Sequence, residues 1–140
     1  MKKKATMEFD YSKSAEFREL QPLRIPAGWS IGWNNLSTTS KVEDGDFGGS
    51  SIFFATNSGR RFMIDVEFRP EFDPSGQFYM TVSYQPWPRT EAGRRKHDEP
   101  VQFDANAEVV HATETPVYSD LISQLETWIG RCTTWVREGH

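Results

Sequence analysis

The sequence contains a single cysteine, three histidines and no long apolar run. One cysteine, Cys132, cannot form an intramolecular disulfide, which is typical of a reducing compartment. The histidines show no i,i+4 spacing, so a structural zinc site is disfavoured. No stretch approaches the roughly 18 apolar residues that a membrane helix needs. Lys2–Lys4 resembles the start of a signal peptide, but no apolar segment follows it, so we expect a cytoplasmic protein that does not bind membranes.

Catalytic signatures are equally scarce. The chain has no Gly-x-Ser-x-Gly nucleophile motif, no phosphate-binding loop and no dinucleotide fingerprint. Cys132 falls on the apolar stripe of a predicted helix, where a small buried side chain is expected rather than a nucleophile. The sequence therefore predicts a protein that is not an enzyme and that binds no metal or cofactor.

Positive charge is also in short supply. Sixteen Lys and Arg are outnumbered by twenty Asp and Glu, which gives a formal net charge of −4. This balance argues against nucleic acid as the main partner. The basic residues of Arg89–Pro100 are interleaved with acids, as in a solvated loop, although Trp87 beside them leaves a protein contact open.

Aromatic residues are abundant, at 14% of the chain, with ten Phe and five Trp. Each ring buries about 150–250 Å², so these side chains can supply the core of one domain. No repeat or linker divides the sequence. Residues 1–140 are therefore predicted to form a single domain.

Alternating apolar and polar residues predict an antiparallel meander of four to five strands. Trp29, Ile31 and Trp33 alternate with small or polar residues and are expected on one face. Ser51–Thr56 and Arg60–Arg69 flank a glycine-containing turn and predict a hairpin.

The remaining strands and loops follow from the same pattern. Phe78–Tyr84 predicts the next strand, while Val101–Phe103 and Glu108–His111 are either a fifth strand or irregular cover. Lys41–Ser51, rich in Gly, Asp and Ser, predicts a long exposed loop.

One helix is expected before the strands in the sequence and another after them. A short one is predicted over Ser14–Leu20, stopped by Pro22. Pro116 at a first helical position predicts a second helix of about twenty residues. Its apolar stripe comprises Val117, Leu121, Leu125, Ile129 and Cys132. The fold class is α+β, a meander packed against a long C-terminal helix.

Asp65 and Glu67 are the strongest candidates for a metal site. Their spacing on a strand places both carboxylates on one face, about 6.5–7 Å apart, and Mg²⁺ binds such groups. A metal-dependent phosphodiesterase is therefore one hypothesis. The polar face of an ordinary sheet is the simpler interpretation, because no lysine lies between Lys41 and Lys96 to stabilise an attacked phosphate.

A partner-binding surface is predicted on this polar face and its adjoining loops. Its proposed members are acidic or aromatic: Asp65, Glu67, Tyr79, Trp87, Glu43, Asp44 and Asp46. Acidic side chains suit capture of a basic protein domain. The three loop acids lack the liganding Glu of a calcium loop, so a protein contact is favoured there.

Three segments carry a resemblance to a group of small bacterial proteins of unknown role. They are "LRIPAGWSIGWNNL" from Leu23, the hairpin strand up to Pro70 with "DPSGQF" after it, and "LETWI" in the last helix. The resemblance covers most of the chain and implies structural motifs only, without catalytic residues. In size, acidity and lack of a catalytic signature, the chain also looks like the immunity proteins of bacterial toxin systems, which bind and block a toxin domain.

Three functions are therefore considered, in this order. The first is a cytosolic protein-binding module, an immunity protein that occludes a basic toxin domain. The second is a structural or interaction protein, monomeric or a homodimer formed through a sheet edge. The third is the metal-dependent phosphodiesterase.

Overall fold

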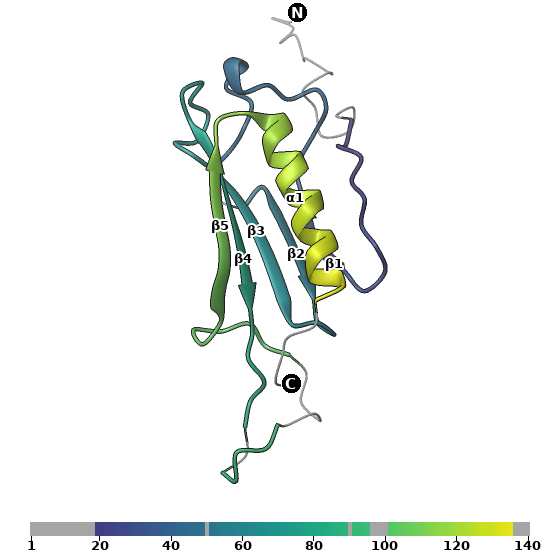
Figure 1. The fold of residues 1–140 in the computed structure, drawn as a ribbon. Coiled ribbons are helices and arrows are strands. Elements are labelled where there is room, and N and C mark those ends of the chain that lie inside the picture. Colours follow the sequence, from purple (N-terminus) through teal and green to yellow (C-terminus); the bar gives the residue numbers. More distant parts are fainter. Residues whose placement is uncertain (1–18, 50, 90, 96–100, 136–140) are drawn as a thin grey trace, which may run out of the picture.

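The computed structural model describes residues 19–49, 51–89, 91–95 and 101–135, and its regular structure consists of strands followed by one helix (Figure 1). In chain order, the elements are β1 (Ser30–Asn34), the 3₁₀ turn η2 (Val42–Asp44), β2 (Phe53–Asn57), β3 (Phe62–Arg69), β4 (Gln77–Tyr84), β5 (Glu108–Thr115) and α1 (Tyr118–Thr133). This order confirms the predicted α+β class.

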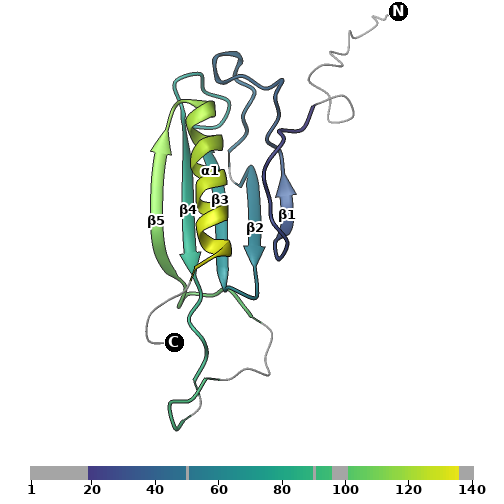
Figure 2. The same ribbon diagram turned by 45° about the vertical axis from the view of Figure 1, so that its right-hand side comes forward.

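The strands form one sheet in the order β1-β2-β3-β4-β5, with every neighbouring pair antiparallel (Figure 2). The meander prediction is thus confirmed with five strands. Glu108–Thr115 forms the fifth strand, whereas residues 101–103 have no regular structure. Short turns join β2 to β3 and β3 to β4, and they favour this topology because an antiparallel neighbour needs no long crossover.

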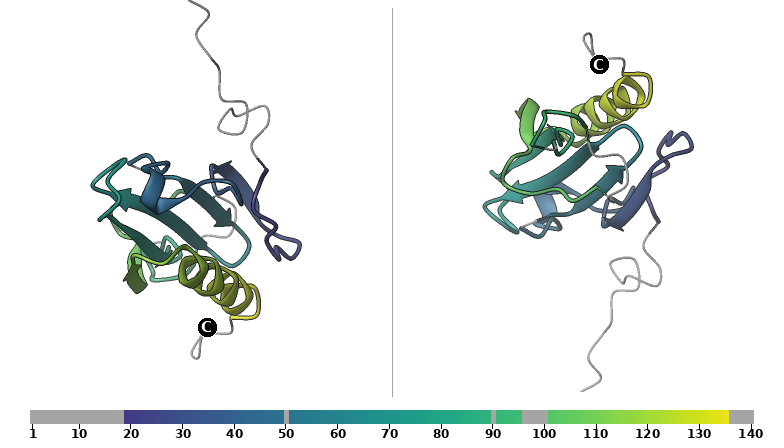
Figure 3. Two further views of the ribbon diagram at one scale, coloured as in Figure 1. Left: turned by 90° about the horizontal axis from the view of Figure 1, so that it is seen from above. Right: turned by 90° about the horizontal axis from the view of Figure 1, so that it is seen from below.

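Helix α1 covers one face of the sheet, and no helix lies on the other face within the described residues (Figure 3). On β3, residues at alternate positions are almost fully buried under α1, and on α1 the buried residues recur every three or four positions. The largest fully buried side chains are Phe53, Phe62, Phe68, Phe78, Leu36, Ile64, Met80, Leu121, Leu125, Ile129 and Val66. Aromatic rings thus supply much of the core, as the composition predicted.

Helix α1 is shorter than predicted and begins later. It contains 16 residues, and Val117 occupies the N-cap position, so Pro116 lies before the helix rather than at its first position. Val117 is 47% exposed and is not part of the buried stripe. The helix starts late because Thr115 is still the last residue of β5, and its hydroxyl accepts a hydrogen bond from the Val117 N–H.

The prediction that Ile31 and Trp33 share a face is wrong. Ile31 pairs with Ala55, but Trp33 pairs with Phe54, and the register shifts between them. Since Ala55 and Phe54 are consecutive, this bulge sends Ile31 and Trp33 to opposite faces. A glycine, Gly32, occupies the bulge, where a Cβ atom would lie 2.8 Å from the Phe54 ring.

The loop predicted to be exposed, Lys41–Ser51, contributes one residue to the core. Phe47 is only 3% exposed and lies against three rings, with centroid distances of 5.7 Å to Phe68, 4.9 Å to Phe78 and 5.4 Å to Tyr118. One aromatic residue therefore anchors a segment whose composition is otherwise that of a solvated loop.

The N-terminal helix prediction falls mainly on residues 14–18, which lie outside the described residues. The two described positions of that segment are not helical, because Leu20 forms an isolated antiparallel bridge with Ser37. From there the chain passes alongside α1, where the Arg24 N–H donates to Glu126 and the Trp29 indole donates to Thr133. None of the helices in the described ranges has the length and apolarity needed to cross a membrane.

Candidate functional site

The face of the sheet opposite α1, called the open face here, carries the predicted acidic pair. Directly paired residues of an antiparallel ladder project to the same side, so the register defines rows across this face. One row consists of Glu67, Tyr79 and Glu114. The neighbouring row consists of Trp33, Phe54, Asp65, Thr81 and Ala112. The structure thus brings three of the predicted residues, Asp65, Glu67 and Tyr79, into adjacent rows.

The charged residues of the open face near the end of β3 contact one another. Arg69 lies 3.4 Å from the carboxylate of Glu67, and its guanidinium carbon is 4.1 Å from the Tyr79 ring centroid. The arginine is 60% exposed and the glutamate 36% exposed at their side chains. Such an exposed pair adds little stability, so a ligand can compete for either charge at low cost.

Aromatic and polar contacts organise the centre of the open face. The Trp33 and Phe54 rings stack with centroids 5.0 Å apart. The Trp33 indole donates to the Ser51 carbonyl, and the Ser51 hydroxyl donates to Asp65. Trp33 remains 46% exposed. This face therefore offers flat aromatic area next to carboxylates.

The other predicted residues lie at the two ends of the sheet. Glu43 and Asp44 are in η2, beyond the end at which β3 finishes (Figure 1). Asp46 follows them and accepts a hydrogen bond from the Lys41 N–H. Trp87 follows β4 at the opposite end, beside the start of β3. The predicted residues therefore do not form one continuous surface.

The predicted metal site on β3 consists of two carboxylates, those of Asp65 and Glu67. Across the described ranges, no group of three or more His, Cys, Asp or Glu side chains is arranged to hold a metal ion. Asp65 already accepts a hydrogen bond from Ser51, and Glu67 faces Arg69. A hard cation in a protein usually requires more oxygen ligands than this pair supplies.

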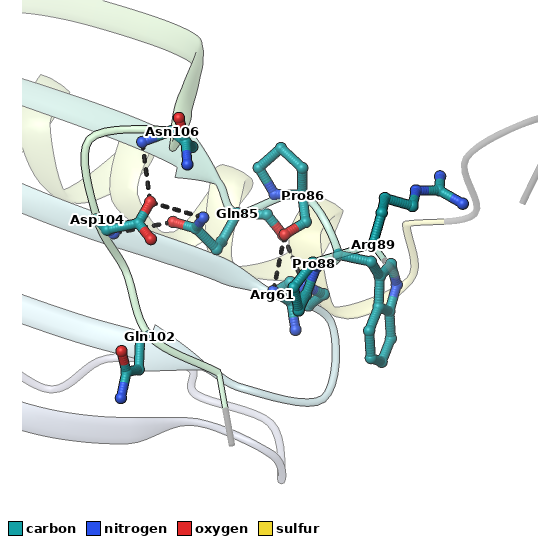
Figure 4. Close-up of a pocket in the computed structure, with 9 residues that line it drawn as sticks. Arg61, Gln85, Pro86, Pro88, Arg89, Gln102, Asp104 and Asn106 are labelled. Carbon is teal, nitrogen blue, oxygen red and sulfur yellow. Dashed lines mark hydrogen bonds between the residues drawn. The ribbon is translucent and has the colours of Figure 1, made fainter. Parts of the chain in front are cut away.

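A cavity of about 600 Å³ lies at the end of the sheet that holds Trp87 (Figure 4). Its walls come from the start of β3, the residues after β4 and the segment that returns to β5. The polar and aromatic residues that line it are Arg61, Gln85, Trp87, Arg89, Gln102, Asp104 and Asn106. Cavities of this volume are in the range that binds small molecules.

Arg61 is the most unusual residue of this cavity, because it is charged and only 4% exposed. Its Nε donates to the Gln85 carbonyl over 2.6 Å and its Nη2 to the Pro86 carbonyl over 2.9 Å. Its guanidinium carbon lies 4.4 Å from the centroid of the Trp87 ring. Burial lowers the pKa of Arg61, while Tyr84 and Asp104 act in the opposite direction.

The opposite wall of the cavity is fixed by a reciprocal pair of hydrogen bonds. The Gln85 amide donates to the Asp104 carboxylate over 2.9 Å, and the Asp104 N–H donates to the Gln85 side-chain oxygen over 3.0 Å. The same carboxylate accepts the Asn106 N–H over 2.8 Å. These contacts attach the segment before β5 to the end of β4 and hold polar groups in the wall.

Sequence patterns did not single out Arg61. It follows Arg60 in a hairpin turn, where two arginines suggest solvent. The backbone distinguishes them, because Arg61 adopts a left-handed φ of 67°, and its side chain donates to the carbonyls that follow β4. Only the fold makes that difference visible.

Comparison of the chain with protein-family models, curated protein sequences and solved structures found no significant match. Its function therefore has to be inferred from the geometry of the open face and the cavity.

Proposed function

We propose that this protein is a protein-binding module that uses the open face of its sheet to bind a basic partner. The observation that carries the proposal is the pair of adjacent rows in which Asp65, Glu67 and Glu114 flank aromatic rings, of which Trp33 is exposed and Phe54 and Tyr79 are half-buried. Arg69 is the cation of β3 on this side, so carboxylates predominate there. Charge of one sign beside aromatic area favours a partner that presents Lys or Arg.

We propose more specifically that the partner is a bacterial toxin domain and that the chain is its cytoplasmic immunity protein. The acidic net charge of −4 supports this, since it accelerates encounter with a basic domain. Glu43 and Asp44, beyond the upper end of the sheet, extend the negative surface. Direct occlusion of the partner's active surface requires no catalytic group or cofactor in this chain.

The test compares binding by the wild-type protein with binding by a charge-reversed open face. A tagged chain is used to capture its partner at low salt, and the partner is then purified and titrated. In the variant Asp65→Lys/Glu67→Lys, we expect association to slow by about tenfold or more and to lose most of its salt dependence. Glu91→Lys is the matched control, an exposed reversal in the loop after β4.

A partner that binds the reversed and wild-type open faces equally well would overturn this proposal. The toxin assignment is tested separately, by measuring whether the wild-type chain abolishes the partner's activity at a stoichiometric ratio. A partner that binds through the open face but retains its activity would support the proposed binding module and contradict the proposed immunity role.

A homodimer is the second candidate, favoured by the edge strand β1. Its residues Ile31 and Trp33 are 39% and 46% exposed, and β1 is the outermost strand of the sheet among the described residues. Light scattering that gives twice the chain mass on dilution would support it. A dilution-stable monomer would reject it.

A further inference from the structure

The end of the sheet opposite η2 contains a buried cation. Arg61 is 4% exposed, and the Asp104 carboxylate of the same cavity acts on its charge without a direct ion pair between the described residues. Two of its nitrogens, Nε and Nη2, are bound to backbone carbonyls. A buried charge usually requires a charged or strongly polar partner.

Further arginines lie near Trp87, a second residue of the cavity wall. The centroid of its ring is 4.4 Å from the guanidinium carbon of Arg61 and 5.8 Å from that of Arg95. A smaller cavity of about 190 Å³, lined by Arg60, Arg61 and Arg95, lies next to Trp87 as well. Exposed Arg89 lines the larger cavity. This end of the molecule is locally basic, in contrast to the net charge of the chain.

The backbone at Arg61 supports a specific role for its side chain. It is a non-glycine residue with φ of 67° in the β2–β3 turn, a position that glycine adopts without strain. The left-handed conformation is strained for an ordinary residue. Such strain persists where the surroundings fix it, and it is concentrated at functional sites.

We infer that the cavity lined by Arg61, Trp87 and Arg89 is a binding site for a small oxyanion, a carboxylate or a phosphate. Guanidinium groups bind both kinds of anion with paired hydrogen bonds. Gln102 and Asn106 provide neutral polar contacts for the remainder of the ligand, while the Asp104 carboxylate is held by hydrogen bonds from Gln85 and the Asn106 N–H. Because the Trp87 indole lies against arginines, its role is to hold the cations rather than to stack on the ligand.

This site is separate from the open-face surface. Glu67 lies six residues along β3 from Arg61, a distance of roughly 20 Å on an extended strand. The proposed oxyanion site therefore does not depend on the proposed protein partner, and the two can be tested separately.

The experiment titrates the ¹⁵N-labelled protein with inorganic phosphate, glutarate and glutaramide at low ionic strength. The Nε–H of Arg61 and the indole N–H of Trp87 serve as reporters. We expect saturable shifts with at least one of the two anions, at concentrations below about 10 mM, and no shift with glutaramide, the uncharged counterpart of glutarate. The anion that binds more tightly shows whether the site prefers a phosphate or a carboxylate.

Variants test whether the shifts arise in the cavity. Arg61→Gly keeps the left-handed turn and removes the cation, and it should weaken binding at least tenfold, as should Arg89→Ala. Arg131→Ala is the matched control, because Arg131 also packs on an indole, 4.9 Å from the Trp128 centroid, but lines neither cavity. Binding in this control should equal that of the wild type.

Three results would overturn the inference. They are no saturable shift with either anion, equal shifts with glutaramide, and equal losses of binding in Arg131→Ala and Arg61→Gly. If Arg61→Gly fails to fold, Arg89→Ala decides, because Arg89 is exposed and its removal leaves the core intact. Unchanged anion binding in a folded Arg89→Ala protein would then exclude the site.

Discussion

Substitution of Phe47 tests whether a single ring fastens the glycine-rich loop to the core. The side chain is 3% exposed, and its centroid lies 4.9 Å from that of Phe78 and 5.4 Å from that of Tyr118. Replacing a buried Phe by Ala costs about 3–5 kcal/mol. A loop can relax more than a strand, so we expect a loss of about 3 kcal/mol for Phe47→Ala, a large part of the about 5–15 kcal/mol typical of a domain.

Urea unfolding followed by far-UV circular dichroism measures this loss. The midpoint should decrease while the slope m stays constant, since the area exposed on unfolding hardly changes. At roughly 4 °C per kcal/mol, the melting temperature should fall by roughly 12 °C.

Phe72→Ala is the matched control for this substitution. Phe72 lies close by, since its N–H donates to the Phe47 carbonyl, but its side chain is 60% exposed. Its loss should change stability by less than about 0.5 kcal/mol. A decrease of less than about 1 kcal/mol for Phe47→Ala, or equal decreases for the two variants, would refute the anchoring role of Phe47.

Two glycine substitutions should have effects of opposite sign. A Cβ atom at Gly130, on the exposed side of α1, would have no neighbour within 4 Å, so Gly130→Ala should stabilise by about 0.5–1 kcal/mol. At Gly76, the Cβ atom would lie 2.7 Å from the buried Phe68 ring, so Gly76→Ala should destabilise by about 1–3 kcal/mol in the same urea assay; equal effects would contradict both. Burial raises the pKa of the Cys132 thiol to about 12, so it should react with Ellman's reagent at pH 8 only on unfolding. An unfolded cysteine has a pKa of about 8.5, so burial of the neutral Cys132 thiol contributes its full stability below that pH, and this contribution is lost as the pH rises towards 12. Fast labelling of the native protein would contradict the prediction, because it would show that the thiol is accessible.

The sequence by itself determined the fold class and most of the sheet. Phe62–Arg69 and Phe78–Tyr84 alternate so regularly that a one-residue slip would turn the buried phenylalanines of both strands to the open face, and the short turn between the strands favours antiparallel pairing. The α1 stripe from Leu121 to Cys132 was equally determinate, because a period of 3.6 residues defines one buried face. Glu67 and Tyr79 could be placed on the polar face for the same reason.

Tertiary structure alone decided the features that depend on a local exception to a pattern. The bulge at Gly32 reverses the face of Trp33, and periodicity cannot locate a one-residue insertion. Phe47 is buried because its ring packs against those of Phe68 and Phe78, a contact that the composition of the loop cannot predict. The cavity around Arg61 exists only because distant segments meet at one end of the sheet. Neither the burial of that arginine nor its contacts with carbonyls after β4 follow from its neighbours along the chain.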